Sequence, residues 1–198
     1  MAAIDPTTTD PRPAIVICAW DEDESGWDPI EDLSGEPWSP TGARTVAVPS
    51  EAPEELASTL SAHLTDQRCR ALLLVGRTRS TDGFQLQMRA ENRSVDGASR
   101  PDGVGPSVAR ATAPVADIVR ALKEAGLAAA ATSEAEDDAG SFLLYRVLAG
   151  LPDGPDTPAI GLLRAPENEP DAAVQRAVKT AAQAMARHLS PVGRARAY

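Results

Sequence analysis

Few side chains in this sequence could carry covalent chemistry. The chain contains two cysteines, Cys18 and Cys69, and two histidines, His63 and His188. Thiol catalysis needs a cysteine beside a base, but both cysteines are predicted on or beside strands and both histidines on helices. Neither cysteine has the spacing of a metal site, and a disulfide framework needs more cysteines than two. We therefore expect reduced thiols and no bound metal.

The remaining candidates are acidic stretches and one serine. Residues 134–138 hold four carboxylates, and residues 21–24 are all acidic. We interpret both as solvated segments, because nothing in their spacing supplies the geometry of a cation site. Ser141 lies in the first turn of a predicted helix, where the helix dipole could polarise a hydroxyl. No base accompanies it, so neither a serine hydrolase nor a cofactor is expected.

The composition indicates one acidic globular domain. The chain has 198 residues, a net charge of −10, and 42% hydrophobic residues. At roughly 100–200 residues per domain, one domain is expected. The negative charge argues against nucleic acid or an anionic membrane as partners. The sequence shows no signal-peptide pattern and no apolar run of about 20 residues, which predicts a cytoplasmic protein.

Hydrophobic patterning predicts a domain over residues 14–190, between polar tails at 1–13 and 191–198. Strands are expected at 14–20, 45–48, 71–76, 84–92, 127–132 and 160–163. Helices are expected at 50–65, 114–124, 138–149 and 171–189. This order predicts a single-domain α/β fold with an open, twisted, mostly parallel sheet and helices on both faces.

Three segments carry more specific expectations. Ser50 is the expected N-cap of the first helix. In 84–92, apolar and polar residues alternate, which predicts one half-exposed strand with its glutamines toward solvent. The segment 21–43 is rich in acidic residues, glycine and proline and contains Trp27 and Trp38. We interpret it as a long loop that holds one short helix at most.

Four stretches of the chain have the character of motifs. Residues 72–92 (LLLVGRTRSTDGFQLQMRAEN) are similar to L-G-Q-A-G-G-R, five residues, and E-x-V-A-I-N. Residues 101–105 (PDGVG) are similar to P-D-N-x-G, 138–145 (DAGSFLLY) to D-A-G-x-Y-L-C-N, and 161–166 (GLLRAP) to G-F-I-H-V-P. In this order they resemble pyroglutamyl-peptidase I, the cysteine peptidase family C15, which removes N-terminal pyroglutamate. At 15–23, where the family has V-L-V-T-G-F-E-P-F, only the strand character survives.

The resemblance implies a phosphorylase/hydrolase-like α/β fold and a homo-oligomer. By position, the family's cysteine falls on Leu144, its histidine on Arg164 and its glutamate on Gln87. Leucine offers no nucleophile, arginine stays protonated at neutral pH, and glutamine lacks the orienting negative charge. The resemblance therefore implies a divergent member without the triad, a pseudoenzyme with a binding or scaffolding role.

A group of polar residues is expected at the rim of the same site. If the resemblance holds, Arg77, Arg79, Gln87, Asn92 and Arg164 gather where strand ends and helix N-termini converge, the usual ligand crevice of an open α/β sheet. Arginines there can hold a carboxylate or phosphate through paired hydrogen bonds. A small anionic or peptide ligand is one hypothesis. The other is that these arginines pair with neighbouring carboxylates of the chain.

Two further functions stay open. One is an enzyme that acts on an amide or peptide-like substrate from a relocated site without cysteine. The other is a protein-interaction module in which Trp27 and Trp38 anchor a partner, since loop aromatics often dominate interfaces. Against the second, tryptophans also fold back onto their own core.

Overall fold

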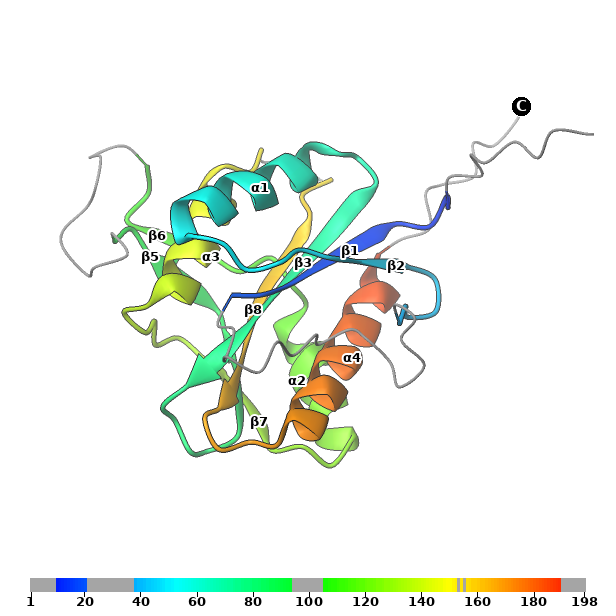
Figure 1. Cartoon of the computed structure of the whole chain (residues 1–198), viewed down its shortest axis with the longest axis vertical. Coiled ribbons are helices and arrows are strands. Elements are labelled where there is room, and N and C mark those ends of the chain that lie inside the picture. The colour runs from blue at the N-terminus through cyan, green and yellow to red at the C-terminus, as the bar shows by residue number, and fades with distance from the viewer. Residues whose placement is uncertain (1–9, 21–37, 94–104, 153, 155, 190–198) are drawn as a thin grey trace, which may run out of the picture.

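A six-stranded sheet runs through the protein (Figure 1). The computed structural model describes residues 10–20, 38–93, 105–152, 154 and 156–189. The strands of the sheet, in spatial order, are β2 (Arg44–Ala47), β1 (Ala14–Ala19), β3 (Cys69–Thr78), β8 (Ala159–Pro166), β4 (Phe84–Gln87) and β7 (Ala129–Thr132). The helices are α1 (Pro53–Thr65), α2 (Val115–Glu124), α3 (Ala139–Ala149) and α4 (Asp171–His188). A small second sheet pairs β5 (Arg89–Glu91) with β6 (Val108–Arg110).

Strand direction in the main sheet is mostly parallel. Strands β2, β1, β3 and β8 run parallel to one another, and β7 runs parallel to β4. The pair β4 and β8 is antiparallel. Because parallel neighbours need long crossovers, the chain alternates strands with helices. The expected α/β fold with a mostly parallel sheet is confirmed.

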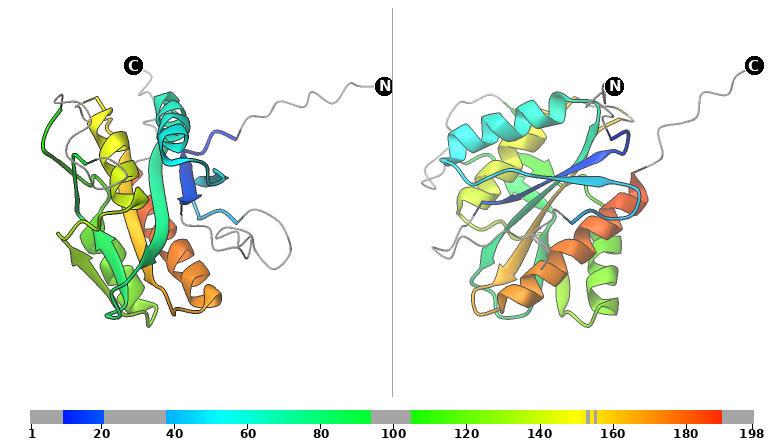
Figure 2. Two further views of the ribbon diagram at one scale, coloured as in Figure 1. Left: turned by 60° about the vertical axis from the view of Figure 1, so that its left-hand side comes forward. Right: turned by 45° about the vertical axis from the view of Figure 1, so that its right-hand side comes forward.

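Both faces of the sheet are covered by helices. Helices α1 and α3 pack on one face, and α2 and α4 pack on the other (Figure 2). Successive strand residues point to opposite faces, so Leu72 and Leu74 of β3 join the core under α1 and α3, while Leu73 and Val75 join the core under α2 and α4. Burial on both sides explains why the central strands are continuous apolar runs.

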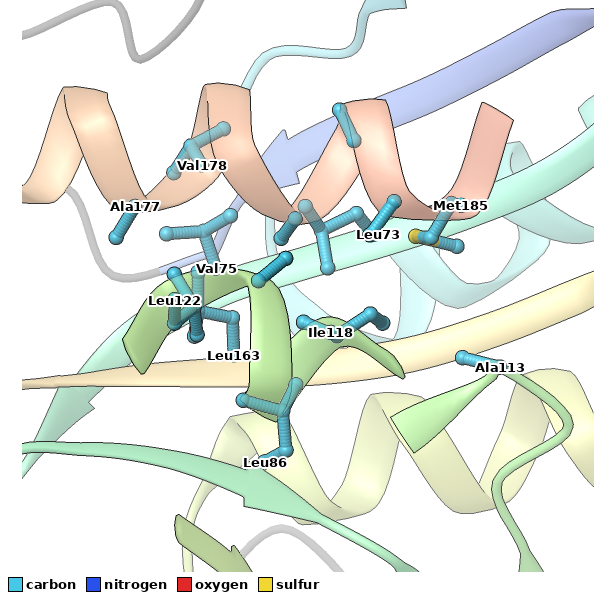
Figure 3. Packing of buried hydrophobic residues seen from close by; sticks show 14 of the residues in the cluster. Leu73, Val75, Leu86, Ala113, Ile118, Leu122, Leu163, Ala177, Val178 and Met185 are labelled. Atoms are coloured by element: carbon cyan, nitrogen blue, oxygen red, sulfur yellow. The ribbon is translucent and has the colours of Figure 1, made fainter. Parts of the chain in front are cut away.

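The core under α2 and α4 combines branched side chains with small ones. Alanines form much of the inner face of α4, which lets the helix lie close to the sheet. Branched residues from five elements interdigitate here, as Figure 3 shows: Val75, Leu163, Leu86, Ile118, Leu122 and Val178. This close packing makes the sheet a rigid platform for the side chains at its ends.

The expected single strand over 84–92 is divided in the structure, because β4 ends at Gln87 and β5 begins at Arg89. Phe84 and Leu86 are buried, but Gln87 is only 1% exposed and Met88 is 37% exposed. The main-sheet strand ends at Gln87, and the chain continues as β5 of the second sheet. Polar alternation marks a solvent face only where that face meets water, and here α3 covers it. Gln87 is buried because it finds hydrogen-bond partners there.

The expected cap of the first helix is also wrong. Helix α1 begins at Pro53, and Ala52 stands at the N-cap without a side-chain hydrogen bond. Proline suits this position because its missing N–H would have had no helical partner. The Ser50 hydroxyl instead lies 3.4 Å from the carbonyl oxygen of Trp20, to which it donates. Ser50 therefore joins two loops and does not start the helix.

Residues 21–37, which include Trp27 and the expected short helix, lie outside the described residues. Most of the motif at 101–105 lies outside them as well. Trp38 is described, and it packs half-buried against the core under α2 and α4 with the Lys179 ammonium 5.7 Å from its ring centre. Trp38 thus folds back onto its own domain. Across the part of the chain that the structure describes, we find no helix with the length and apolarity needed to cross a membrane.

Candidate functional site

The candidate site lies where three parallel strands end beside the start of α3. Gly76 of β3 and Arg164 of β8 are partners in register, and Trp20 directly follows β1. All three residues lie on the side of the sheet that faces α3. In each strand, the residue two positions earlier belongs to the core under α1 and α3, and side chains two residues apart point to the same face. Carboxyl ends of parallel strands and a helix N-terminus meet here, as the ligand crevice of an α/β sheet requires.

A buried ion pair fixes the centre of this site. Arg164 is 1% exposed, and its guanidinium donates to both carboxylate oxygens of Asp138, from Nη1 to Oδ2 at 2.5 Å and from Nη2 to Oδ1 at 2.8 Å. Asp138 is also the N-cap of α3, because its Oδ1 accepts the backbone N–H of Ser141 at 2.9 Å. One carboxylate therefore caps the helix and neutralises the buried cation.

The other donors of Arg164 are also occupied. Its Nε donates to Gln87 Oε1 at 2.9 Å, Nη1 to the Arg77 carbonyl at 3.2 Å, and Nη2 to Ser141 Oγ at 3.1 Å. A guanidinium has five N–H groups, and each of the five has an acceptor within the protein. An added anion would have to displace one of these acceptors.

Gln87 and Ser141 complete the network. Gln87 Nε2 donates to the Arg89 carbonyl at 2.8 Å and to Ser141 Oγ at 3.1 Å. The Ser141 hydroxyl thus accepts from two side chains, and its own proton can reach Gln87 Oε1 at 3.4 Å. A neutral amide oxygen is no base, and two donors occupy the oxygen lone pairs. The serine is ordered but is not activated as a nucleophile.

Leu144, the third matched position, lies one turn after Ser141 on α3. It is fully buried in the core under α1 and α3, together with Phe142 and Tyr145. The hollow beside Ser141, which Phe142 and the acidic residues before α3 line, has a volume of about 10 Å³, which is room for one water molecule. A hollow of this size has no room for a substrate side chain.

The structure brings together only part of the expected rim. Arg77 is one residue after Gly76, so its side chain points to the opposite face of the sheet, where it bonds to the carbonyls of Pro166 and Glu169 and to Asp171. Arg79 is exposed beyond the end of β3, and Asn92 follows β5. Among the described residues, the hydrogen bonds and ion pairs of Arg164 involve neither Arg79 nor Asn92. Gln87 and Arg164 do meet.

Sequence reasoning missed Trp20. Its ring centre lies 5.6 Å from the Arg164 guanidinium carbon, which is a cation–π distance. The sequence does contain a signal, since a tryptophan stands at the end of a buried strand. Glycines stand at positions 76 and 140, where the backbone comes close to its ring. Asp138 was recognised only as part of an acidic turn, and its pairing across 26 residues of sequence is visible only in the fold.

Both cysteines are buried in strands of the main sheet. Cys18 is fully buried in β1 and Cys69 is 5% exposed at the start of β3. Burial raises the pKa of the Cys69 thiol above its ordinary value. Because the thiolate is the reactive form, a buried thiol with a raised pKa is a poor nucleophile.

We expect native Cys69 to be alkylated by iodoacetamide about 100-fold more slowly than in the urea-unfolded chain, since reaction requires both opening and loss of the proton. Mass spectrometry of peptides after timed labelling measures this. Equal labelling rates in the native and unfolded protein would contradict the burial that the structure assigns to this thiol.

Several solved structures share the fold of this chain. The chain superimposes on pyrrolidone carboxyl peptidase from Thermus thermophilus with a TM-score of 0.68 at 19% identity, over 86% of this chain and 98% of that one. For pyroglutamyl peptidase I from Bacillus amyloliquefaciens the TM-score is 0.70 at 17% identity, over 89% and 98%. This chain has the pyroglutamyl-peptidase fold. Neither a protein-family profile nor a curated protein sequence matches it.

The pyroglutamyl-peptidase fold is the one that the motif resemblance implied. A third structure, the pyrrolidone carboxyl peptidase of Thermococcus litoralis, gives a TM-score of 0.69 at 15% identity and covers 89% of this chain and 94% of its own. Identities this low establish the shared architecture. What the site does in this chain has to be argued from its own side chains.

Proposed function

We propose that this chain is a pyroglutamyl-peptidase-like protein that performs no thiol peptidase chemistry and acts by binding or scaffolding. The observation that carries the proposal is the network around Arg164. The matched position of the base holds a guanidinium whose five donors are all satisfied internally. The matched position of the nucleophile is Leu144, which is buried in the core.

Chemical reasoning supports the loss of each catalytic role. Leu144 cannot form a covalent intermediate, Arg164 cannot accept a proton at neutral pH, and Gln87 carries no charge to orient a base. The loss of a single member of such a unit lowers the rate by about 10⁴-fold or more. The thiols of this chain lie in strands and do not replace the missing nucleophile.

The network also bears on the ligand of the proposed binding role. A small anion at Arg164 would compete with Asp138, which is already held in a two-point hydrogen bond and caps α3. A peptide or protein partner that uses other surfaces avoids this competition. Assembly into a homo-oligomer and a cytoplasmic location belong to the same proposal.

The test is hydrolysis of a fluorogenic pyroglutamyl amide by the full chain, with and without prior alkylation by iodoacetamide. The pyroglutamyl peptidase I of Bacillus amyloliquefaciens serves as the active reference. We expect no turnover above buffer from this chain, and no change after alkylation. Turnover that alkylation abolishes would overturn the proposal.

A second outcome would overturn the proposal differently. Turnover that survives alkylation but disappears in Ser141→Ala would mean a relocated, serine-based enzyme on this fold. Ser141→Cys serves as the matched variant, because it keeps a small side chain at the same place. Absence of turnover in the wild-type chain and in both variants is the expected result.

A further inference from the structure

The indole of Trp20 lies against two glycines from different elements. A Cβ built on Gly76 would lie 2.2 Å from Cε2 and Cζ2 of Trp20, and one built on Gly140 would lie 2.5 Å from Cζ2. Side chains do not pack this closely, so only glycine admits the ring at either position. Gly76 belongs to β3 and Gly140 to the first turn of α3. The indole is therefore enclosed by a strand and a helix.

A third wall of this space is the guanidinium of Arg164, which lies 5.6 Å from the ring centre of Trp20. Its five hydrogen bonds fix its orientation independently of the indole. A planar cation beside a flat ring is a favourable arrangement. The two glycines and the arginine thus define a narrow, flat space.

Among the described residues, the walls of this space match the indole in shape but not in polarity. Trp20 Nε1 is buried and has no hydrogen-bond acceptor among the described residues. Buried N–H groups without a partner are rare in folded proteins. A space built for the indole alone would be expected to offer an acceptor at this atom. The walls instead match any flat ring of similar size.

We propose that Gly76, Gly140 and Arg164 form a binding site for a flat aromatic ring, and that Trp20 occupies it as the chain's own ligand. An external ring of this class enters only where Trp20 is displaced or removed. The inference rests on the proposed binding role, because it specifies the class of ligand that this end of the sheet would bind. The wild-type chain is then expected to bind no added indole at this site, because Trp20 already occupies it.

The test uses the full chain with Trp20→Gly, which empties the space, and indole as the probe. We expect a lower melting temperature in the variant and a recovery of about 3–6 °C when indole is about tenfold above its Kd. Trp38→Gly is the matched control, because Trp38 packs on the other face of the sheet beside Lys179. We expect no recovery in this control and no shift in the wild-type chain.

Shape selectivity is measured in the same Trp20→Gly protein with phenol and cyclohexanol, which are similar in size and uncharged but differ in flatness. Phenol is expected to raise the melting temperature more than cyclohexanol does. No recovery with indole, or an equal recovery in Trp38→Gly, would overturn the proposal. So would equal effects of the two alcohols.

A second measurement applies even if Trp20→Gly does not fold. The chain has three tryptophans, so replacing Trp27 and Trp38 by phenylalanine leaves Trp20 as the only indole. In that background, Gly140→Ala should drive the ring out of its space, which shifts the emission to longer wavelength and increases acrylamide quenching. Unchanged emission and quenching would overturn the proposal. These readouts need no turnover. They can therefore contradict the ring site while the peptidase assay supports the proposed function, and they can support the ring site while the peptidase assay contradicts the proposed function.

Discussion

Replacing Arg164 with alanine is expected to lower the free energy of unfolding by about 3 kcal/mol or more, because it leaves a partly buried carboxylate without its partner. Asp138 keeps 25% of its side chain exposed, so solvent compensates in part and the loss lies toward the lower end of the range for broken buried pairs. Gln87 and Ser141 each lose a donor in the same change. Urea unfolding followed by circular dichroism measures the loss.

Three matched variants separate the contributions to this loss. Asp138→Asn keeps an effective helix cap but removes the charge, so its effect isolates the ion pair. Arg164→Lys keeps the charge but loses the planar fork, and an intermediate loss is expected. Arg70→Ala breaks the exposed pair with Asp156 and should change stability by about 1 kcal/mol at most. A similar small change for Arg164→Ala would show that the buried network contributes little.

The sequence predicted those features that depend on local pattern. The apolar runs at 14–20 and 71–76 and the 3.6-residue periodicity of 171–189 correspond to β1, β3 and α4. The order of strands and helices was enough to predict a mostly parallel sheet covered on both faces. Which face of the sheet a strand residue points to also follows from the sequence, because successive residues alternate. The structure shows that β3 continues through Thr78, and the alternation then places Arg77 on the face opposite Gly76.

The network itself depends on contacts that are distant in the sequence. The burial of Gln87 follows from its bond to Arg164, 77 residues away, and from Ser141, 54 residues away. Without those partners, glutamine in a strand is correctly expected at the surface. The glycines at 76 and 140 could be seen in the sequence, but Trp20, the residue that requires them, comes from a third element. Only the fold shows that one ring lies against both.

Gly76→Ala is expected to destabilise the protein by about 1–3 kcal/mol, the usual range for overpacking a buried site. The new methyl group would lie 2.2 Å from two atoms of the Trp20 ring, so either the ring or β3 must move. The same substitution in a Trp20→Ala background should be close to neutral, because the space that the methyl group needs is then empty. The double-mutant cycle isolates this interaction between the two positions.

Gly42→Ala is the matched control for this cycle. Gly42 has a φ of +86° with no atom within 4 Å of a built Cβ, so alanine there is strained by its backbone and meets no neighbour. Its effect on the free energy of unfolding should be the same with and without Trp20. A coupling of about 1–3 kcal/mol is therefore expected for Gly76 with Trp20, and about zero for Gly42 with Trp20. If the effects of Gly76→Ala and Trp20→Ala simply add, then the indole does not fill the space between β3 and α3, and the glycine at 76 needs another explanation.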